Sequence, residues 1–370
     1  MTRIAVTTDA IRERPDGIGI VSRHWVRLLL DSDLEVELWD YQFSGDAQKV
    51  NFPKRELKNS WPCLRAGLWN AFLPFQARSF LQDYRTILTL SGLPPVVGSL
   101  ERFMPAIYDI IDLKYPEIQR LGRAKKAYLQ RTLPYALKRV RKILAISSFT
   151  ANDIVRSLEI SPSRIEVVPL GPSFGDIVPK DCPEKVGKIR GKFGLRDPFL
   201  LMVGTIHPRK NHTMVLSILE ALMAKGFRVD LVVAGQRGWK DSEFQAQLGR
   251  SPVKERVQVL GYVDDDSLWQ LYREAELLLY PSIYEGFGLP VLDAMALGCP
   301  VVTSVNSPMA EIGGQAVLAA DPRSYEDLLM TVESVLTEKS LQQELVARGL
   351  ERAETFTWGN ARSSLLSALQ

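Results

Sequence analysis

The sequence has little cysteine and histidine and no long hydrophobic run. Its three cysteines, Cys63, Cys182 and Cys299, are spread over 370 residues without metal-ligand spacing, which argues against a disulfide framework and favours a reducing compartment. No stretch reaches the roughly 18 uninterrupted apolar residues of a spanning helix, and the opening MTRIAVTTDA lacks the apolar core of a signal peptide. We therefore expect a cytoplasmic location, with any membrane contact peripheral, at the inner face of the cytoplasmic membrane.

Metal-ligating patterns are also missing. The histidines, His24, His207 and His212, have no companion ligands near them in the sequence, and no D-x-D pair stands between an expected strand and a loop. We interpret the acidic run 264–266 as the solvated start of a helix. We expect neither a metal ion nor another cofactor.

Composition and charge narrow the class of protein. Hydrophobic residues at 46% and charged residues at 24% match folded globular chains, and the length favours two domains. Lys and Arg number 46 against 43 Asp and Glu, a formal charge of +3. This excess is too small to indicate nucleic-acid binding by itself, and we expect no nucleic-acid partner.

Short apolar and β-branched runs alternate with longer amphipathic segments along most of the chain. This alternation is typical of βαβ units around a parallel sheet. The expected strands of a first sheet are 3–8, 34–38, 105–108, 143–146 and 165–168. The expected strands of a second sheet are 199–203, 229–234, 257–260, 277–280, 301–303 and 316–319. We predict an α/β protein with two Rossmann-like domains.

The pattern is interrupted between Gly171 and Asp197, where Pro, Gly and charged residues replace the apolar periodicity. We predict a first domain over 1–171, a linker over 172–197 and a second domain over 198–370. In two facing doubly wound domains, ligands collect where the carboxyl ends of the strands look into one cleft. Each motif below directly follows an expected strand.

The most informative segment is YPSIYEGFGLPVLDAMALGCPVVTS, residues 280–304. A buried strand leads into a glycine-containing loop, Pro290 suits the first helical position, and Gly298 suits the end of the helix. Glu285 in the loop and Asp293 on the first helical turn are carboxylates that can each accept hydrogen bonds from sugar or ribose hydroxyls. The alternative is a solvated loop charge and a carboxylate stabilised by the helix dipole.

This segment resembles the E-x7-E signature of family 4 retaining glycosyltransferases of the GT-B fold, with Asp293 in place of the second glutamate. The resemblance implies that Glu285 lies beside the transferred sugar and that Asp293 holds the nucleotide ribose. It also implies that the backbone amides of Phe287, Gly288 and Leu289 contact sugar hydroxyls. Because Asp is one methylene shorter than Glu, we expect the ribose contact to be longer, shifted or mediated by water.

A second motif, VGTIHPRKN, ends the first strand of the second domain at residues 203–211. Arg209 and Lys210 place two cations where the charge of a diphosphate leaving group would develop. The segment resembles the family's V-G-R-x-x-x-x-K loop, with Lys210 at the lysine and Thr205 where many members have arginine. The G-T-x-x-P-R-K-N subset of the family implies that Arg209 supplies the missing guanidinium. The alternative is a solvated basic turn.

Glycines also follow the first strand of the first domain. In RERPDGIGIVSRHW, Gly17 and Gly19 allow the backbone to approach a diphosphate at a helix N-terminus. A dinucleotide fingerprint would need glycine where Ser22 stands, although Glu37 and Asp40 after the second strand leave a nicotinamide oxidoreductase open. The glycosyltransferase family's Gly-rich loop, which closes over donor phosphate and acceptor, fits better. A purely structural turn is the remaining alternative.

The segment AIYDIIDLKYPE, residues 106–117, resembles the family pattern H-D-L-x-x-L-R-Y-P-E. Tyr108 replaces the histidine that approaches the donor sugar in the family, and its hydroxyl can donate or accept a hydrogen bond. Asp109 is retained at a strand end, where it would orient the acceptor hydroxyl or hold a sugar hydroxyl. The alternative is a core tyrosine followed by a capping aspartate.

Further blocks extend the resemblance at 232–239, 257–282 and 304–314. By resemblance, Gly235, Tyr262 and Val263 cradle the nucleotide base. The segment FTW, residues 356–358, resembles the start of the last GT-B helix, which in the family crosses back to the first domain.

The resemblance is dense over 198–322 and thin over 41–104. Its Y-D-I-I and P-R-K-N variants resemble mannosyltransferase-like members of bacterial surface polysaccharide pathways. We therefore expect a nucleoside diphosphate sugar as donor, with GDP-mannose as the first choice, and a glycan or lipid-linked hydroxyl as acceptor. A nucleotide-sugar binding protein without turnover and a GT-B epimerase remain as alternatives, although an epimerase shares the fold without this E-x7-D block.

Two segments outside these motifs suggest surfaces. No acid occurs between Glu117 and Asp153, so the basic stretch 120–142 either contacts an anionic membrane or anionic lipid-linked acceptor or is an ordinary solvated helix face. The aromatic stretch 61–80 is interpreted as helix-packing core rather than an interfacial surface.

Overall fold

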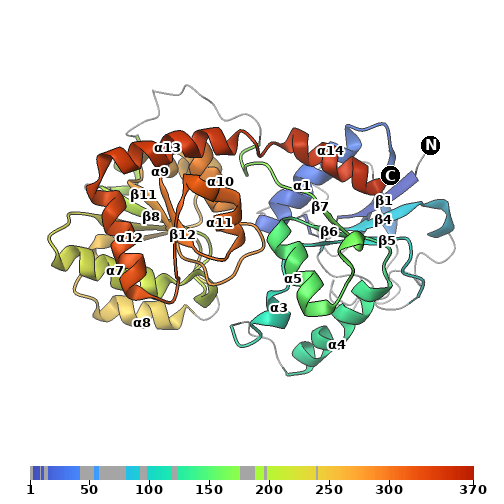
Figure 1. Cartoon of the computed structure of the whole chain (residues 1–370), viewed down its shortest axis with the longest axis horizontal. Helices are drawn as coiled ribbons and strands as arrows, with labels where there is room; N and C mark the ends of the chain where they lie inside the picture. Colours follow the sequence, from blue (N-terminus) through green and yellow to red (C-terminus); the bar gives the residue numbers. More distant parts are fainter. Residues whose placement is uncertain are drawn as a thin grey trace. The chain divides into compact units, whose positions relative to one another are not determined.

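The computed structural model describes residues 3–8, 10–11, 16–41, 54–57, 81–91, 98–118, 123–175, 188–195, 198–238 and 241–370. The chain divides into two compact units. Unit 1 comprises Met1–Ser173 together with Trp358–Gln370, and unit 2 comprises Phe174–Thr357. Both units are α/β, as the sequence predicted (Figure 1).

Unit 2 is built on a six-stranded parallel sheet. Its strands are β8 (Phe199–Val203), β9 (Asp230–Ala234), β10 (Val257–Gly261), β11 (Leu277–Tyr280), β12 (Val301–Ser304) and β13 (Leu318–Ala320). The order β10-β9-β8-β11-β12-β13 is that of a doubly wound Rossmann sheet, in which the winding reverses between the first and fourth strands. The reversal therefore lies between β8 and β11, which pair directly.

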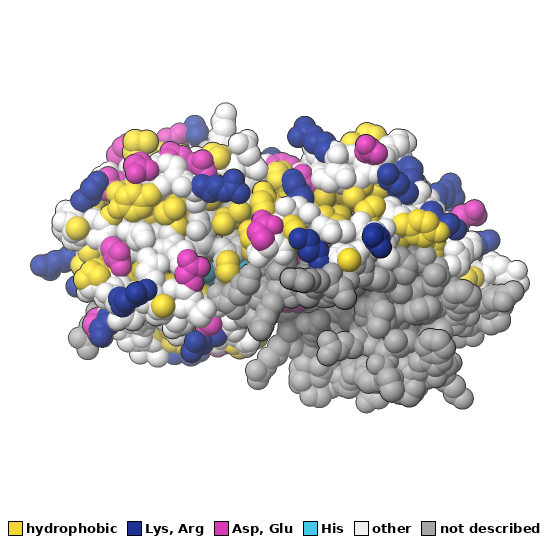
Figure 2. Space-filling view, turned by 90° about the horizontal axis from the view of Figure 1, so that it is seen from below, with side chains coloured by type: hydrophobic (Ala, Val, Ile, Leu, Met, Phe, Trp, Pro, Cys, Tyr) yellow, Lys and Arg dark blue, Asp and Glu magenta, His cyan; other side chains and the backbone are white. Residues whose placement is uncertain are grey.

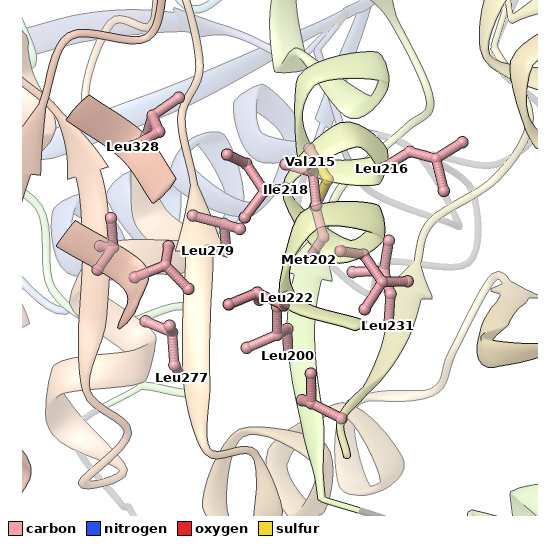
Figure 3. Close-up of a cluster of buried hydrophobic side chains, with 14 of the residues drawn as sticks. Leu200, Met202, Val215, Leu216, Ile218, Leu222, Leu231, Leu277, Leu279 and Leu328 are labelled. Carbon is pink, nitrogen blue, oxygen red and sulfur yellow. The ribbon is translucent and has the colours of Figure 1, made fainter. Parts of the chain in front are cut away.

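The core of unit 2 explains why its strands are apolar throughout. Every residue of β8 and β11 is buried, as expected for parallel strands covered on both faces. Figure 3 shows side chains of these strands facing those of helices α7 (His212–Ala224) and α12 (Tyr325–Thr337), among them Leu200, Met202, Leu279, Ile218, Leu222 and Leu328. Each fully buried Leu or Ile contributes about 1.5–3 kcal/mol, so this packing holds the strand ends firmly in place.

The other helices of unit 2 complete its layers. They are α6 (Lys188–Phe193), α8 (Ser242–Arg250), α9 (Asp265–Glu274), α10 (Leu289–Ala296), α11 (Pro308–Gly313) and α13 (Lys339–Ala353), with 3-10 turns η5 (Pro208–Lys210), η6 (Lys254–Arg256) and η7 (Gly314–Ala316). Figure 1 shows α9, α10 and α13 on the side of the sheet opposite α7 and α8. The acidic run 264–266 does start a helix, because the Asp264 carboxylate accepts the Ser267 N–H at 2.9 Å.

Unit 1 contains a seven-stranded parallel sheet. Its strands are β1 (Arg3–Thr7), β2 (Glu35–Tyr41), β3 (Lys54–Leu57), β4 (Thr86–Thr89), β5 (Phe103–Ile107), β6 (Ile143–Ala145) and β7 (Ile165–Val167). The order β3-β2-β1-β4-β5-β6-β7 is again the Rossmann order, extended by β7. The sequence did not predict β3, whose KREL is mostly charged, or β4, whose TILT alternates threonine with apolar residues.

Helices cover both faces of this sheet. They are α1 (Gly17–Leu30), α3 (Ile111–Lys114), α4 (Arg123–Arg139), α5 (Ser148–Leu158) and α14 (Trp358–Leu369), with 3-10 turns η2 (Leu81–Asp83) and η3 (Pro162–Arg164). Buried residues of α4 and α5 pack on the strands, whereas α1 packs with α14. The Arg164 guanidinium donates to the carbonyls of Leu137 at 3.0 Å and Lys138 at 3.1 Å, which satisfies carbonyl groups at the end of α4.

Helix α14 is far from the rest of unit 1 in the sequence but packs within it. The Trp358 indole stacks on His24 of α1, with ring centroids 3.9 Å apart, and its N–H donates to the Pro172 carbonyl at 2.8 Å. A Cβ on Gly171 would come 2.6 Å from the indole, so glycine is required beneath it. These contacts tie the helix to the strand-bearing part of the unit.

Part of the segment predicted as a linker, 172–197, is helical. In α6, Ile189 is buried and Arg190 forms an ion pair with Glu274 of α9 at 2.9 Å. Lys192 pairs with Asp264 at 3.0 Å. These contacts make α6 a packed element of unit 2, which the charged sequence KIRGKF did not indicate because it contributes few apolar residues to the core.

The sequence predicted an aromatic segment of helix-packing core and no membrane-spanning helix. The aromatic stretch 61–80 lies outside the described residues. Among the helices that the structure describes, none combines the length and apolarity needed to cross a bilayer.

Candidate active site

The predicted motifs of unit 2 meet where the winding of its sheet reverses. The loop after β8 carries Arg209 and Lys210, and the loop after the neighbouring β11 carries Glu285. Loops that follow adjacent parallel strands lie at the same edge of a sheet, and this reversal point is where doubly wound sheets bind ligands. The two motifs thus form one candidate site.

Three predicted site residues form a compact cluster of charges. The Lys210 ammonium lies 2.7 Å from Glu285 Oε1. The Arg209 guanidinium pairs with Glu285 Oε2 and donates to the Tyr284 carbonyl at 3.1 Å. Lys210 and Glu285 are each only 8% exposed. Two cations therefore share one buried carboxylate.

The electrostatics keep this cluster ionised at neutral pH. Burial alone would raise the pKa of Glu285, but the charges of Arg209 and Lys210 outweigh it and lower the value to about 2. Burial lowers the pKa of Lys210 to about 8, with the Arg209 charge adding to that effect and Glu285 opposing it. The lysine is thus cationic at neutral pH but closer to losing its proton than an exposed lysine.

Backbone geometry fixes the loop that carries the cations. Gly204, directly after β8, has φ +115°, and a Cβ there would approach Lys210 Cε at 3.2 Å. The Ile283 N–H donates to the Arg209 carbonyl at 2.8 Å and so joins the two loops. The Asn211 side-chain amide donates to the carbonyls of Pro281 at 3.3 Å and Pro322 at 2.7 Å. The cluster is held by backbone contacts as well as by charge.

The F-G-L-P turn follows Glu285 and starts α10. Gly288 has φ +102° and is the N-cap of this helix, and a Cβ there would lie 2.5 Å from Met309 Cγ. Phe287 is buried and packs edge-on against Phe356, with centroids 6.3 Å apart. Leu289 is the first helical residue. Glycine is thus needed at 288 both for its φ angle and for this close packing.

The predicted position of Asp293 needs correction. The sequence placed Pro290 first in the helix and Asp293 on the first turn, but α10 begins at Leu289 with Pro290 as its second residue. Asp293 therefore starts the second turn, where it is 3% exposed. It lies near Tyr272 of α9, whose pKa is raised by burial first and then by the Asp293 charge. The expected C-terminal glycine is confirmed, because Gly298 follows the helix with φ +73°.

The residues predicted to cradle a base lie after β9 and β10. A Cβ on Gly235 would come 1.9 Å from the Gly204 carbonyl oxygen, so glycine lets these two strand ends touch. Tyr262 is 52% exposed, whereas Val263 is buried. Thr205, at the family's arginine position, is exposed beside the buried Lys210 loop. Gly235 is thus tied to the cation loop, and Tyr262 is exposed at the end of β10.

Tyr108 and Asp109 follow β5 in unit 1 and have local partners. The Tyr108 hydroxyl lies 3.1 Å from the Ser22 hydroxyl of α1, and the tyrosine is 6% exposed. Asp109 is half-buried and accepts the N–H of Ile111, the first residue of α3, at 3.0 Å. The burial of Tyr108 matches the core alternative, whereas Asp109 precedes Ile110, the N-cap of α3.

The glycines of the first-strand loop also lie at a helix start. Gly17 is exposed and is the first residue of α1, and the Gly19 N–H donates to the Asp16 carboxylate at 2.9 Å. The N-terminus of α1 is therefore already capped by an acidic side chain. A diphosphate that approached the Gly19 amide would have to displace Asp16.

The nicotinamide alternative is not supported by Glu37. Its carboxylate accepts from Arg3 at 2.7 Å, from the Tyr84 hydroxyl at 2.8 Å and from the Trp39 indole at 3.3 Å. Ser22, which stands where a dinucleotide fingerprint has glycine, is fully buried against Tyr108. Glu37 and Ser22 thus already form hydrogen bonds within unit 1.

The cluster contains one residue that was not predicted from the sequence. Tyr280 ends β11, and its hydroxyl contacts both Lys210 and Glu285. The sequence signal was its place as the last residue of the strand at the reversal point, directly before the Glu285 loop. Within the described residues, no group of three or more His, Cys, Asp and Glu is placed to hold a metal ion.

Burial of His212 leads to a stability prediction. His212 starts α7, is 3% exposed and packs edge-on against Phe244. Burial first, then the Lys210 charge, lowers its pKa to about 3. Between pH 6.5 and 3, His212 is therefore protonated in the unfolded chain but not in the folded chain. The free energy of unfolding falls as pH falls through this range, and at pH 5 it is about 2 kcal/mol lower than at neutral pH.

The measurement is thermal or urea unfolding of wild type and His212→Leu at pH 7.5 and pH 5. The variant is expected to lose less stability over this interval than wild type. Parallel losses in the two proteins would show that His212 titrates normally in the folded state.

A family model and a full-length relative both resemble this chain. The family model described as glycosyl transferases group 1 matches residues 187–352. The O-antigen chain mannosyltransferase B of Escherichia coli is 33% identical over 99% of both chains.

Solved structures match over the full length. The sucrose-phosphate synthase of Thermosynechococcus elongatus aligns over 99% of this chain and 98% of its own, with TM-score 0.75 and 18% identity. The Anabaena protein HepE, solved with UDP-glucose, aligns over 100% of this chain and 99% of its own, with TM-score 0.75 and 15% identity.

Proposed function

The chain belongs to the group 1 glycosyl transferases, and we propose that it transfers a sugar from a nucleoside diphosphate donor to a hydroxyl of a glycan or lipid-linked acceptor in surface polysaccharide synthesis. The expected glycosyltransferase activity class and GT-B fold are confirmed by these similarities. The observation that carries the finer proposal is the buried cluster of Arg209, Lys210 and Glu285 at the reversal point of the unit 2 sheet.

The cluster suits a diphosphate because it holds two cations in a site with little water. In the absence of donor, Glu285 pairs with both cations and leaves the cluster with a net positive charge. A diphosphate carries more charge than one carboxylate, so Arg209 and Lys210 would transfer their hydrogen bonds to it. We propose that these side chains supply the charge that a metal ion supplies in other sugar transferases, and that no other cofactor takes part.

The proposed reaction proceeds with retention of configuration. The bond between the sugar C1 and the diphosphate oxygen breaks, and the acceptor oxygen bonds to C1 on the same face. The acceptor proton passes to the departing phosphate oxygen. Arg209 and Lys210 stabilise the negative charge of that leaving group, which is largest in the transition state. Glu285, released from the cations, stabilises the positive charge on the sugar ring.

The remaining predicted residues take roles around this centre. On the donor side, the amides of Phe287, Gly288 and Leu289 would bind sugar hydroxyls, and Asp293 would reach the ribose. Gly235, Tyr262 and Val263 would contact the base, for which the exposed Tyr262 ring offers a stacking surface.

The acceptor side is assigned to unit 1. Asp109 and Tyr108 stand at the carboxyl end of β5. Gly17 and Gly19, in the first turn of α1, are proposed to approach the donor diphosphate instead. We propose Asp109 as the residue that orients the acceptor hydroxyl, since its carboxylate is half-buried and placed at a strand end.

GDP-mannose is the first candidate donor. The support is the name of the E. coli relative and the two mannosyltransferase-like sequence variants. UDP-glucose is the second candidate, because HepE has the same fold and was solved with it.

A panel of nucleotide sugars tests the proposal. GDP-mannose, UDP-glucose and ADP-glucose are incubated with the full chain, and released nucleoside diphosphate, transferred sugar and epimerised donor are measured. Release of GDP from GDP-mannose, together with stabilisation of the fold by GDP, is the expected result. Donor binding without release would indicate a binding protein, and a changed sugar without transfer would indicate an epimerase.

A basic surface on α4 favours contact with anionic lipid. Arg131, Lys138 and Arg139 are exposed, and Tyr135 is 50% exposed beside Arg139, which donates to its hydroxyl at 2.6 Å. No acidic residue occurs in the sequence of this helix. We propose that this face rests on an anionic membrane, where each cation contributes about 1 kcal/mol.

Vesicle sedimentation tests this contact. Arg131→Gln with Lys138→Gln removes two cations and is expected to weaken binding to phosphatidylglycerol vesicles by about thirtyfold. The matched control is Arg323→Gln with Lys339→Gln in unit 2, whose surface mixes Lys and Arg with Asp and Glu in the view of Figure 2. Equal weakening in both double variants would argue against a specific α4 surface.

A further inference from the structure

Tyr280 is the last residue of β11 and is fully buried. Its backbone is held from the neighbouring strand, because it pairs in register with Thr303 of β12 and its carbonyl accepts the Thr303 hydroxyl at 2.9 Å. The tyrosine ring is therefore a fixed part of the sheet edge, whereas its hydroxyl reaches into the charge cluster.

The hydroxyl bonds to both charges of the central ion pair. Lys210 Nζ donates to it, and it donates to Glu285 Oε1 at 3.2 Å. The Lys210 ammonium also lies 4.4 Å from the centroid of the tyrosine ring. Burial first, then the Glu285 charge, raises the pKa of Tyr280 well above 10, so the hydroxyl keeps its proton and remains a donor.

We propose that Tyr280 is a positioning residue for sugar transfer: its single hydroxyl holds the Lys210 ammonium and the Glu285 carboxylate in place while the cations exchange Glu285 for the donor diphosphate. This inference rests on the proposed function and concerns a residue outside the E-x7-E signature and the V-G-R-x-x-x-x-K loop. Tyr280 itself contacts neither the sugar nor the phosphate in this proposal.

The need for such a residue follows from burial. When Arg209 and Lys210 turn towards a diphosphate, Glu285 loses its charged partners but stays in a site where it is 8% exposed. A buried carboxylate without a donor is strongly destabilised. The Tyr280 hydroxyl is fixed by the sheet, so it continues to donate to Glu285 and to accept from Lys210 throughout the exchange.

Unit 1 offers a matched control for this arrangement. The buried Tyr84 hydroxyl donates to Glu37 at 2.8 Å, and Glu37 also accepts from Arg3 at 2.7 Å. A tyrosine, a carboxylate and a cation thus form a similar set of contacts within unit 1. Tyr84→Phe removes the same chemical group as Tyr280→Phe.

The experiment compares wild type, Tyr280→Phe and Tyr84→Phe as full chains. GDP release from GDP-mannose gives kcat and KM between pH 6 and 9.5, and binding of inorganic pyrophosphate is measured over the same range. Tyr280→Phe is expected to lower kcat by about tenfold or more, the effect of one hydrogen bond to a charged group. It should also move the alkaline midpoint of both profiles to lower pH, because the Lys210 ammonium loses an acceptor. Tyr84→Phe should leave kcat and the midpoints as in wild type.

The alkaline midpoint of the pH profiles distinguishes a positioning role of Tyr280 from a loss of folded protein. Loss of folded protein lowers every point of a profile by the same factor and does not move its midpoint. A lower kcat with unchanged midpoints, or wild-type values of both, would overturn the proposal. If wild type releases no nucleoside diphosphate from any sugar donor, the proposed function fails, and the pyrophosphate midpoint still decides the role of Tyr280.

Discussion

Replacing Lys210 with methionine is expected to lower sugar transfer by about two to three orders of magnitude, the typical cost of removing one group that stabilises transition-state charge in a buried site. Methionine has a similar length but no charge, so the leaving diphosphate would keep only Arg209. The loss should appear mainly in kcat, because the charge of the leaving group is greatest in the transition state.

The same lysine should set the alkaline side of the pH profile. Because burial lowers its pKa to about 8, activity and diphosphate affinity are expected to fall as pH rises through 8, where the ammonium loses its proton. Lys210→Arg should retain part of the activity and move this fall to higher pH, since a guanidinium stays charged.

Lys225 provides the control for this substitution. It lies in the same unit, directly after α7, and forms an ion pair with Glu333. Lys225→Met should leave transfer and its pH profile unchanged. A wild-type rate in Lys210→Met, or an alkaline fall that persists unaltered in Lys210→Arg, would contradict the assignment of Lys210 to the leaving group.

Replacing Glu285 with glutamine is expected to have two opposite effects: transfer should fall by about a hundredfold or more, while affinity for GDP should rise by about tenfold. Transfer falls because the neutral amide cannot stabilise positive charge on the sugar. Affinity rises because, without sugar, GDP competes with the Glu285 carboxylate for Arg209 and Lys210, and the variant removes that competitor.

Isothermal titration with GDP and a transfer assay measure the two effects separately. The matched control is Glu333→Gln, which breaks the Lys225 pair on the surface of the same unit and should change neither quantity. Unchanged or weaker GDP binding in Glu285→Gln would mean that the cations are not held by Glu285 before the donor arrives. The charge exchange would then be wrong even if transfer were lost.

Unit 2 could be predicted strand by strand because its sheet is covered on both faces. The bounds of β8 and β11 agree with the sequence prediction, since continuous buried runs such as FLLMV and LLLY stand out against their polar flanks. In unit 1, β4 is equally buried, but its sequence TILT alternates threonine with Ile and Leu. It therefore lacks the continuous apolar run that marks β11.

The charged residues of the site could be predicted from the sequence, but the contacts among them could not. Arg209, Lys210 and Glu285 belong to recognisable motifs, and strand order brings those motifs together. Tyr280 is separated from Lys210 by 70 positions, so only the folded sheet shows that its hydroxyl completes the cluster. For Asp293, a helix that starts one residue earlier than expected moves the carboxylate into a buried second turn.

The return of α14 to unit 1 has a consequence for biosynthesis. The strands of unit 1 are synthesised before any of Phe174–Thr357, but the helix that stacks Trp358 on His24 is synthesised only after it. At about 5–20 residues per second, that interval is on the order of ten to forty seconds. During this time Trp358 does not yet cover α1. A chaperone would therefore be most useful while the first unit is complete except for α14.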